Sequence, residues 1–460
     1  MALWCVTGIV MIYAPYPRID ADARLRSLAV LDWPRVARLA RQVAGGNQQY
    51  ARFQLEMLSG SPVLRLWRVD SSMQLLQLNA SAGASGIDEP QAVDAAVRYA
   101  KYLGRPVRAA VTELIPYDQW TVAGSRRDRP LYRIDIGDDS GTEIYVSSRS
   151  GMVVQATTRA QRFWGWLGAV PHWLYLSSLR SRPVLWSQVV IWTSLLGVLL
   201  ASTGLIIGIC ALAQSAKQVR YSPYQGVMLW HHLAGLAFGV LVLSWVLSGF
   251  FSMNPWGLME GGEVQDARAR LAGPLPAGAG IAAVLEALAT ASPAEIRALE
   301  SAPLNGELFV VATRAHGARI RYDVHGVPHE LSAPDIFAAV VRVAGTGAAW
   351  TMLRTDDAYH YGFGHEQATL PVVRARSAQG DYYYLDPLSA ELLDRADSGD
   401  RAYRWWFSAL HRWDFTRALR TSLGRTVVML PLLLGAVVLT CLGAFLGIRR
   451  LTPWRVRESR

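Results

Sequence analysis

The stretch "GVMLWHHLAGLAFGVLVLSWVLSGFFSM", residues 226–253, decides the fold class because it is long and apolar enough to cross a lipid bilayer. A helix needs about 20 apolar residues to span the hydrocarbon core. Residues 185–213 and 425–448 meet the same requirement. The composition agrees, since 51% of the 460 residues are hydrophobic and only 18% are charged, against about 25% charged in soluble domains. The sequence therefore predicts a membrane protein.

The charges and cysteines exclude several classes of protein. The formal net charge of +10 is spread along the chain without a Lys/Arg-rich stripe. Anchoring at the membrane edge explains it better than nucleic-acid binding, so no nucleic-acid partner is expected. All cysteines lie in apolar runs, which disfavours a disulfide framework or a thiolate metal site; they are Cys5, Cys210 and Cys441. A Ser-His-Asp, HExxH or phosphate-loop hydrolase motif is absent from the sequence.

Two polar segments, 16–184 and 254–424, separate the apolar runs and have mixed α and β patterns. "DWPRVARLARQVA" (32–44) predicts a helix that begins after an aspartate cap. "PLYRIDIGDDSGTEIYVSSRSGMVV" (130–154) predicts three strands, and "DYYYLDPLSAELL" (381–393) predicts two strands joined by a turn. We expect small α+β units, more than one in each segment.

The chain repeats itself. A shift of 239 residues places His172 on His411, and a shift of 241 residues places Trp4 on Trp245, Thr7 on Ser248 and Gly8 on Gly249. Each half therefore contains a helix, a polar segment, a histidine and a second helix. Under the second shift, the counterpart of His231 falls about ten residues before Met1. We expect residues 1–15 to be the second half of a helix that has lost one histidine upstream; the alternative is a genuinely short helix.

The expected fold is an α-helical bundle of four transmembrane helices, the first truncated, with two α+β segments on one side of the membrane. Basic residues such as Lys217, Arg220, Arg449 and Arg450 occupy the short link and the C-terminal tail, which the positive-inside rule places in the cytoplasm. The boundaries are: partial helix 1–15, extracytoplasmic segment 16–184, helix 185–213, cytoplasmic loop 214–225, helix 226–253, extracytoplasmic segment 254–424, helix 425–448 and cytoplasmic tail 449–460. The expected location is a bacterial inner membrane, with the large segments in the periplasm.

Four of the nine histidines lie in or near membrane helices, where an ionisable side chain indicates function by default. His231 and His232 project roughly 100° apart on a helix, so they cannot bind one iron together. One is expected to be a ligand and the other a contact to a lipid headgroup or a haem propionate. The alternative is that both bond a neighbouring helix. His172 and His411 are related by the repeat, so they could face each other across one flat cofactor.

The depth of the histidines predicts two sites. His231 lies near the cytoplasmic end of its helix, whereas His172 and His411 lie near the opposite face, about 30 Å away. We therefore expect an outer haem held by His172 and His411 and an inner haem held by His231 and the missing histidine. Two axial imidazoles leave no open position on the iron, which suits electron transfer. A CxxCH motif is absent from the sequence, so the haem would be b-type, with one or two per chain.

Further contacts are expected near these sites. Arginine suits carboxylates and phosphates, so the arginines at the outer membrane face are candidates for haem propionates or lipid phosphates: Arg180, Arg182, Arg412 and Arg417. Histidines in the polar segments are surface residues by default. His360, His365 and Tyr383, with Tyr382 and Tyr384, are nevertheless candidates for contact with an electron acceptor.

The chain resembles membrane proteins that carry PepSY domains and PepSY-associated transmembrane helices. The similar stretches are "WHHLAGLAFGVLVLSWVLSGFFSMNP" (230–255), "YYYLDPLSAELL" (382–393), "RWWFSALHRWDF" (404–415) and "RTVVMLPLLLGAVVLTCLGAFLGIRRL" (425–451). Part of this family resembles inner-membrane siderophore reductases, in which b haems pass electrons outward. The resemblance aligns His172, His231 and His411 with the family's recurring histidines.

The resemblance implies that electrons move from a cytoplasmic or quinol donor to a ferric siderophore or another extracytoplasmic acceptor. It also supplies a rival. PepSY domains elsewhere resemble peptidase inhibitors or sensors, so the alternative is a membrane-anchored regulator without redox activity.

Overall fold

Three long helices dominate one part of the computed structural model, which describes residues 1–45, 48–78, 86–124, 126–216, 221–362 and 368–451. They are α8 (Pro183–Ala216), α9 (Gly226–Phe251) and α16 (Ser422–Leu451). By length and composition each can cross a membrane. The fourth apolar helix, α1 (Ala2–Tyr13), has 12 residues, or about 18 Å at 1.5 Å per residue. The three predicted spans are therefore confirmed as helices, with ends shifted by a few residues.

Helix α9 packs between α8 and α16, and α1 lies against α16. Trp245, Met429 and Ala436 are buried where α9, α16 and α1 meet. Glycines allow the close approach of the helices. A Cβ on Gly435 would lie 2.2 Å from the Phe238 ring, so no larger residue fits there unless that ring moves.

The largest sheet combines strands from both polar segments. Its order is β10-β9-β8-β1-β2-β3, and we call it the shared sheet. Its strands are β1 (Arg52–Leu58), β2 (Ser61–Trp67), β3 (Met73–Gln77), β8 (Ile296–Ser301), β9 (Val310–Arg314) and β10 (Arg319–Tyr322). Strands β1 and β8 pair antiparallel with Leu55 opposite Leu299. The two polar segments therefore form one body joined at this pair of strands.

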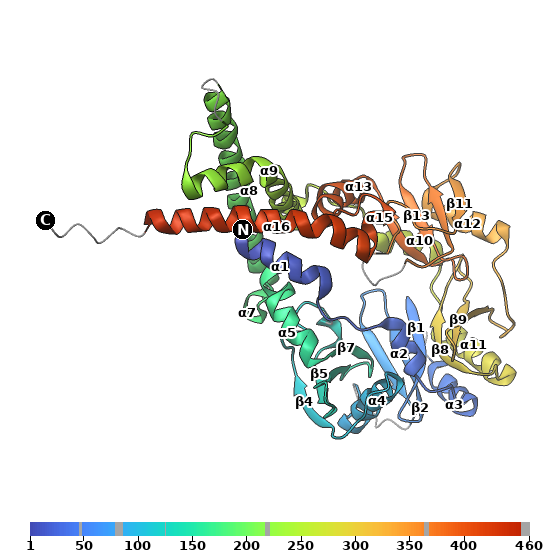
Figure 1. The fold of residues 1–460 in the computed structure, drawn as a ribbon. Coiled ribbons are helices and arrows are strands. Elements are labelled where there is room, and N and C mark those ends of the chain that lie inside the picture. The colour runs from blue at the N-terminus through green and yellow to red at the C-terminus, as the bar shows by residue number, and fades with distance from the viewer. Residues whose placement is uncertain (46–47, 79–85, 125, 217–220, 363–367, 452–460) are drawn as a thin grey trace.

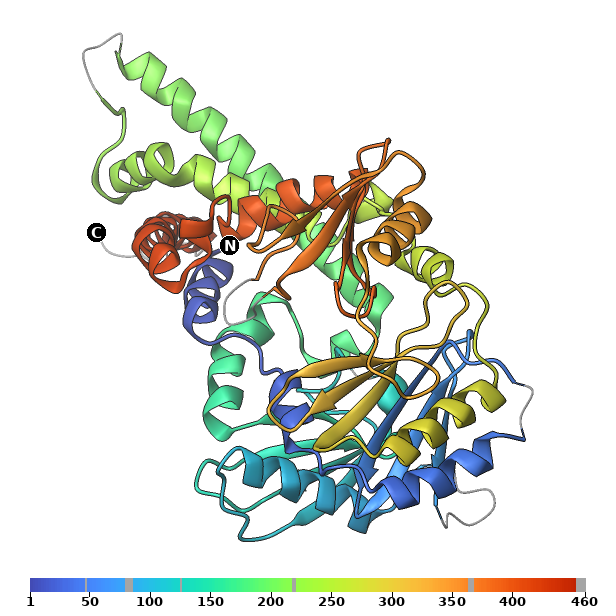
Figure 2. The same ribbon diagram turned by 90° about the vertical axis from the view of Figure 1, so that its right-hand side faces the viewer.

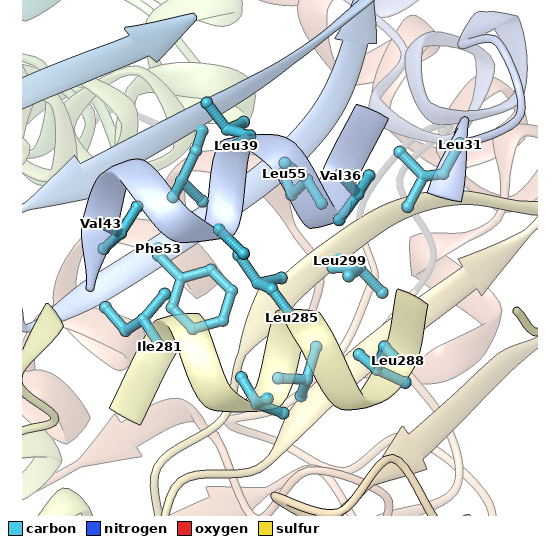
Figure 3. Packing of buried hydrophobic residues seen from close by; sticks show 14 of the residues in the cluster. Leu31, Val36, Leu39, Val43, Phe53, Leu55, Ile281, Leu285, Leu288 and Leu299 are labelled. Carbon is cyan, nitrogen blue, oxygen red and sulfur yellow. The ribbon is translucent and has the colours of Figure 1, made fainter. Parts of the chain in front are cut away.

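The core of this body lies between the shared sheet and two helices, α3 (Trp33–Val43) and α11 (Gly278–Ala291), which run side by side on one face of the sheet (Figure 3). Leu39 from α3 and Leu285 from α11 are fully buried there with Phe53 of β1. The Asp32 side chain accepts from the Arg35 amide at the start of α3, which confirms the predicted cap.

Each polar segment also has a four-stranded antiparallel sheet. The N-terminal sheet contains β4 (Val111–Ile115), β5 (Leu131–Asp135), β6 (Glu143–Ser147) and β7 (Val153–Thr157). The C-terminal sheet contains β11 (Ala349–Leu353), β12 (Val372–Arg376), β13 (Tyr382–Leu385) and β14 (Leu392–Ala396). The predicted strands in 130–154 and 381–393 are thus confirmed. Further helices of these units are α2 (Ala21–Ser27), α4 (Glu89–Tyr102), α10 (Val264–Ala272) and α12 (Ala333–Ala344).

Short helices connect the sheets to the long helices. After the N-terminal sheet come α5 (Arg159–Leu167), α6 (Ala169–His172) and α7 (Ser177–Arg180). After the C-terminal sheet come α13 (Ser398–Tyr403), the π-helical turn η3 (Arg404–Ala409), α14 (Leu410–Arg412) and α15 (Arg417–Arg420). The end of α8 at Ala216 and the end of α16 at Leu451 point away from the sheets (Figures 1 and 2). The sheets therefore all lie on one side of the long helices.

Candidate functional site

The structure brings His172 and His411 together, although 239 residues separate them in the sequence. His172 ends α6 and His411 lies in α14. Their ring centroids are 6.0 Å apart, and the ring planes are inclined by 64°. Each ring comes from the connection that follows its own four-stranded sheet, so the two halves contribute equivalent residues. We call these two residues the histidine pair.

The surroundings of His172 determine which ring nitrogen carries the proton. Nδ1 lies 3.1 Å from the Trp4 carbonyl oxygen and 3.1 Å from the Thr7 hydroxyl. The Thr7 hydroxyl donates its own hydrogen to the Leu3 carbonyl at 2.7 Å, so it can only accept from the ring. A carbonyl also only accepts. Nδ1 of His172 is therefore protonated, which leaves the lone pair on Nε2.

His411 is held in the same way on α9. Its Nδ1 lies 3.1 Å from the Ser248 hydroxyl, and that hydroxyl donates to the Trp245 carbonyl at 3.0 Å. The proton of His411 therefore also sits on Nδ1. Among the described residues, Nε2 of neither His172 nor His411 makes a hydrogen bond. Thr7 and Ser248, which the repeat superimposes, thus have equivalent contacts.

Glycines let both rings lie close to a helix. A Cβ on Gly8 would be 3.4 Å from Cε1 of His172, and one on Gly249 would be 3.8 Å from Cε1 of His411. In each half the helix therefore offers a carbonyl, a hydroxyl three residues later and a glycine four residues later. This spacing places all three on one face of the helix.

The separation of the histidine pair fits two axial ligands on one iron. A metal–imidazole bond is about 2 Å, and the ligating nitrogen is about 1 Å from the ring centroid, so two such rings have centroids about 6 Å apart. The hydrogen bonds at Nδ1 provide the outer-shell support that metal-ligating histidines usually have. Among the described residues, no group of three His, Cys, Asp or Glu residues is arranged to hold a metal ion. A haem needs only the pair, because its porphyrin supplies the other ligands.

His231 contacts α16 through part of this pattern, a carbonyl and a glycine four residues later, with Leu442 in place of the hydroxyl residue. Its Nδ1 lies 3.2 Å from the Leu439 carbonyl, and a Cβ on Gly443 would be 3.0 Å from its Cε1. The proton is again on Nδ1. Along α9, His231 is about 25 Å from Ser248, which contacts the histidine pair. His231 therefore lies well away from the histidine pair, and no other described histidine ring contacts it.

His232 has both ring nitrogens engaged. Nε2 donates to the Gly208 carbonyl of α8 at 2.9 Å, and Nδ1 lies 2.9 Å from the Ser222 hydroxyl. His232 therefore links α9 to α8. This agrees with the alternative interpretation of the sequence, in which the histidine bonds a neighbouring helix. A contact of His232 with a lipid headgroup or propionate stays a prediction.

Three of the four arginines predicted to contact propionates have other neighbours in the structure. Arg180 lies 4.3 Å from the Trp186 ring, and Arg412 lies 5.6 Å from the Phe407 ring. Arg417 pairs with Asp356 at 2.8 Å. Arg182 is exposed just before α8. Their contact with a propionate or a lipid phosphate stays a prediction.

Most residues predicted to contact an acceptor lie inside the C-terminal unit, and their contact with an acceptor stays a prediction. Tyr383 and Tyr384 are 5% and 0% exposed, because both pack inside the C-terminal unit. His360 is 4% exposed, and its ring stacks on Tyr384 with centroids 5.0 Å apart. None of these side chains is open to an acceptor from solvent in this structure. Tyr382 is half-buried, and His365 lies outside the described residues.

His360 is bonded as a cation. Nδ1 lies 2.5 Å from Asp394 Oδ2, and Nε2 lies 3.0 Å from the Thr369 carbonyl. Both partners accept, so both ring nitrogens donate. Burial alone would lower the pKa of His360, but the bonds to Asp394 and Thr369 raise it overall. His360 therefore fastens the loop before β12 to the C-terminal sheet.

A buried ion pair that the sequence did not reveal ties this loop to the His411 segment. Arg404 and Asp414 are 6% and 0% exposed, and Nη1 of Arg404 lies 2.7 Å from Oδ1 of Asp414. These two atoms are close but not aligned as a hydrogen bond. Nε of Arg404 donates to the Ala358 carbonyl at 2.8 Å, and the Tyr361 hydroxyl donates to Asp414 at 3.0 Å. The pair therefore positions the segment that carries His411.

Comparison with models of protein families, with curated proteins and with solved structures gives no match for this chain.

Proposed function

We propose that this chain is a b-haem electron-transfer protein of the bacterial inner membrane. The observation that carries the proposal is the histidine pair, whose ring centroids are 6.0 Å apart. In each ring, Nδ1 is bonded to a helix and the lone pair of Nε2 is free. His172 and His411 would hold an outer haem, and His231 would help to hold an inner one. When bound, the haem supplies reversible one-electron chemistry.

The protein residues have three tasks in this proposal. Thr7 and Ser248 fix the tautomer and orientation of the axial imidazoles through Nδ1. The helices exclude water from the pair, and the two histidine depths divide the path across the bilayer. With both imidazoles of the pair as ligands, the site would favour electron transfer over oxygen binding.

The direction of transfer belongs to the same proposal. The sheets lie on one side of the long helices, and we place that side in the periplasm, as the basic residues near the ends of α8 and α16 indicate. Residues 1–15 would belong to a fourth transmembrane helix. A cytoplasmic or quinol donor would reduce the inner site, and an extracytoplasmic acceptor such as a ferric siderophore would be the substrate. Reduction weakens its hold on iron, because Fe(II) is a poorer partner than Fe(III) for hard oxygen ligands. The polar segments would be PepSY-like units.

An optical spectrum of the protein purified from haem-replete cells tests the proposal. We expect a Soret band, with sharp α and β bands after reduction. His411→Ala or His172→Ala should remove about one haem's absorbance, because one axial bond is lost. His325→Ala, at an exposed site on the C-terminal segment, is the matched control and should not change the spectrum. A colourless protein would refute the proposal and favour the PepSY regulator.

A further inference from the structure

A row of aromatic rings leads from the histidine pair toward the C-terminal sheet. The Phe407 ring centroid lies 5.4 Å from that of His411, and the Tyr403 centroid lies 5.1 Å from that of Phe407. All three belong to one continuous helical stretch formed by α13, η3 and α14. Trp405 of the same stretch is 40% exposed, so this stretch joins the histidine pair to the surface.

A second group of aromatic residues connects the same helical stretch to the C-terminal sheet. Trp405 Nε1 donates to the Tyr359 hydroxyl at 3.3 Å. The Tyr359 ring stacks on Tyr382 of β13, with centroids 5.4 Å apart and planes inclined by 28°. Both tyrosines are half-buried. Tyr359 and Tyr382 therefore form a partly open aromatic surface, in contrast to the buried Tyr383 and Tyr384.

Two arginine side chains lie near the Tyr382 ring. The guanidinium carbons of Arg374 and Arg376 each lie 5.7 Å from the Tyr382 ring centroid. Arg374 is paired with Asp357 at 3.1 Å. Arg376, opposite Tyr382 in the register, is exposed and makes no ion pair among the described residues. One uncompensated guanidinium therefore stands beside two stacked tyrosine rings.

The aromatic surface is fixed relative to the histidine pair. The loop that carries Tyr359 is bonded to the His411 segment through the Ala358 carbonyl and the Tyr361 hydroxyl. Nη1 of Arg420 also donates to the Asp357 carbonyl at 2.9 Å. These bonds lie on both sides of Tyr359, so its position depends on the segment that positions His411.

We propose that Tyr359, Tyr382 and Arg376 form the docking site for an anionic, aromatic electron acceptor. Tyrosine faces stack on flat rings, and a planar guanidinium binds carboxylate or phenolate oxygens while stacking on aromatic groups. Charge complementarity selects an anion, because an uncharged ligand gains little from Arg376 and a cation is repelled. The site is connected to the histidine pair through the helical stretch that carries Trp405, Phe407 and His411.

The electron-transfer role of this site rests on the proposed function; the binding itself does not. One electron would pass from the reduced haem at the histidine pair to the docked acceptor. The site at the histidine pair would lose one electron and the acceptor would gain it, so the electrons balance. No bond forms or breaks, and no proton is required.

The test is direct binding of a redox-inert probe, gallium(III) tris-catecholate, which is a trianion with flat aromatic faces. Binding to the oxidised full chain in detergent is measured by calorimetry. We expect Arg376→Gln to weaken binding about tenfold, with an unchanged optical spectrum and unchanged thermal unfolding. Arg38→Gln, at an exposed position on α3, is the matched control. Added salt should weaken binding to the wild type and to the control variant.

An uncharged gallium(III) tris-hydroxamate distinguishes the ligand classes. It should bind the wild type more weakly than the catecholate and should be insensitive to Arg376→Gln. Equal catecholate affinity of the wild type and Arg376→Gln, or hydroxamate binding as tight as catecholate binding, would overturn the proposal. A colourless protein that still binds the probe through Arg376 would remove the electron-transfer role and leave the docking site.

Discussion

Asp414→Asn should strongly destabilise the segment that carries His411. Asp414 is 0% exposed and Arg404 is 6% exposed, so the variant leaves a guanidinium buried without its counter-charge. Removing one partner of a buried ion pair costs about 3–5 kcal/mol. Asp414 also accepts from the Tyr361 hydroxyl, and the amide keeps one oxygen for that bond. We therefore expect the cost to come chiefly from the unpaired charge.

The assay is thermal unfolding of the purified protein in detergent, followed by tryptophan fluorescence, with the haem absorbance recorded on the same samples. The unfolding midpoint should fall, and the absorbance assigned to the outer haem should disappear at a lower temperature than in the wild type. Arg404→Met combined with Asp414→Asn should recover most of the loss, because no buried charge is then unpaired.

Asp139→Asn provides the matched control, because Asp139 pairs with Arg108 on the surface, where the two side chains are 80% and 56% exposed. An exposed pair contributes little, so this variant should unfold with the wild type. If Asp414→Asn also unfolded at the wild-type temperature, the argument that the buried pair positions His411 would be refuted.

Three further predictions follow from the packing and charges. Gly435→Ala should destabilise the helices, because its Cβ would lie 2.2 Å from Phe238; Gly447→Ala, with nothing within 4 Å, should not, as thermal unfolding would show. Burial would raise the pKa of Glu56, but its two arginine partners hold that pKa below the usual 4.5. The ionised Glu56 carboxylate therefore stabilises the fold above pH 4.5, and this stabilisation is lost as the pH falls through the pKa of the folded state. Acid unfolding of Glu56→Gln should lack that component. His360 has a raised pKa, so its stabilisation is complete below about pH 6.5 and lost as the pH rises through the folded pKa; His360→Gln should flatten that dependence.

The sequence was sufficient for the features that depend on local pattern. Apolar length predicted α8, α9 and α16, and the cap at Asp32 predicted the start of α3. The internal repeat predicted that His172 and His411 are equivalent, and it also superimposed Thr7 on Ser248. Their shared role at Nδ1 was therefore accessible in principle from the repeat.

Other features depend on pairing between distant residues, which no local pattern records. The shared sheet requires β1 to pair with β8 across more than 200 residues. The burial of Tyr383 follows from the side of β13 that faces the core, and the triple tyrosine run does not reveal which side that is. In the sequence, Arg404 and Asp414 likewise look like ordinary surface charges. Their burial depends on the distant loop that carries Tyr361, whose hydroxyl donates to Asp414.

The most direct test of the central claim is low-temperature electron paramagnetic resonance of the oxidised protein, in the wild type and in His411→Ala. If His172 and His411 bind one iron through Nε2, the wild type shows a low-spin ferric signal from two axial imidazoles. In His411→Ala that signal loses the contribution of one haem, and a high-spin ferric signal or a reduced haem content replaces it. An identical low-spin signal in both proteins, or no haem signal in either, would contradict the claim.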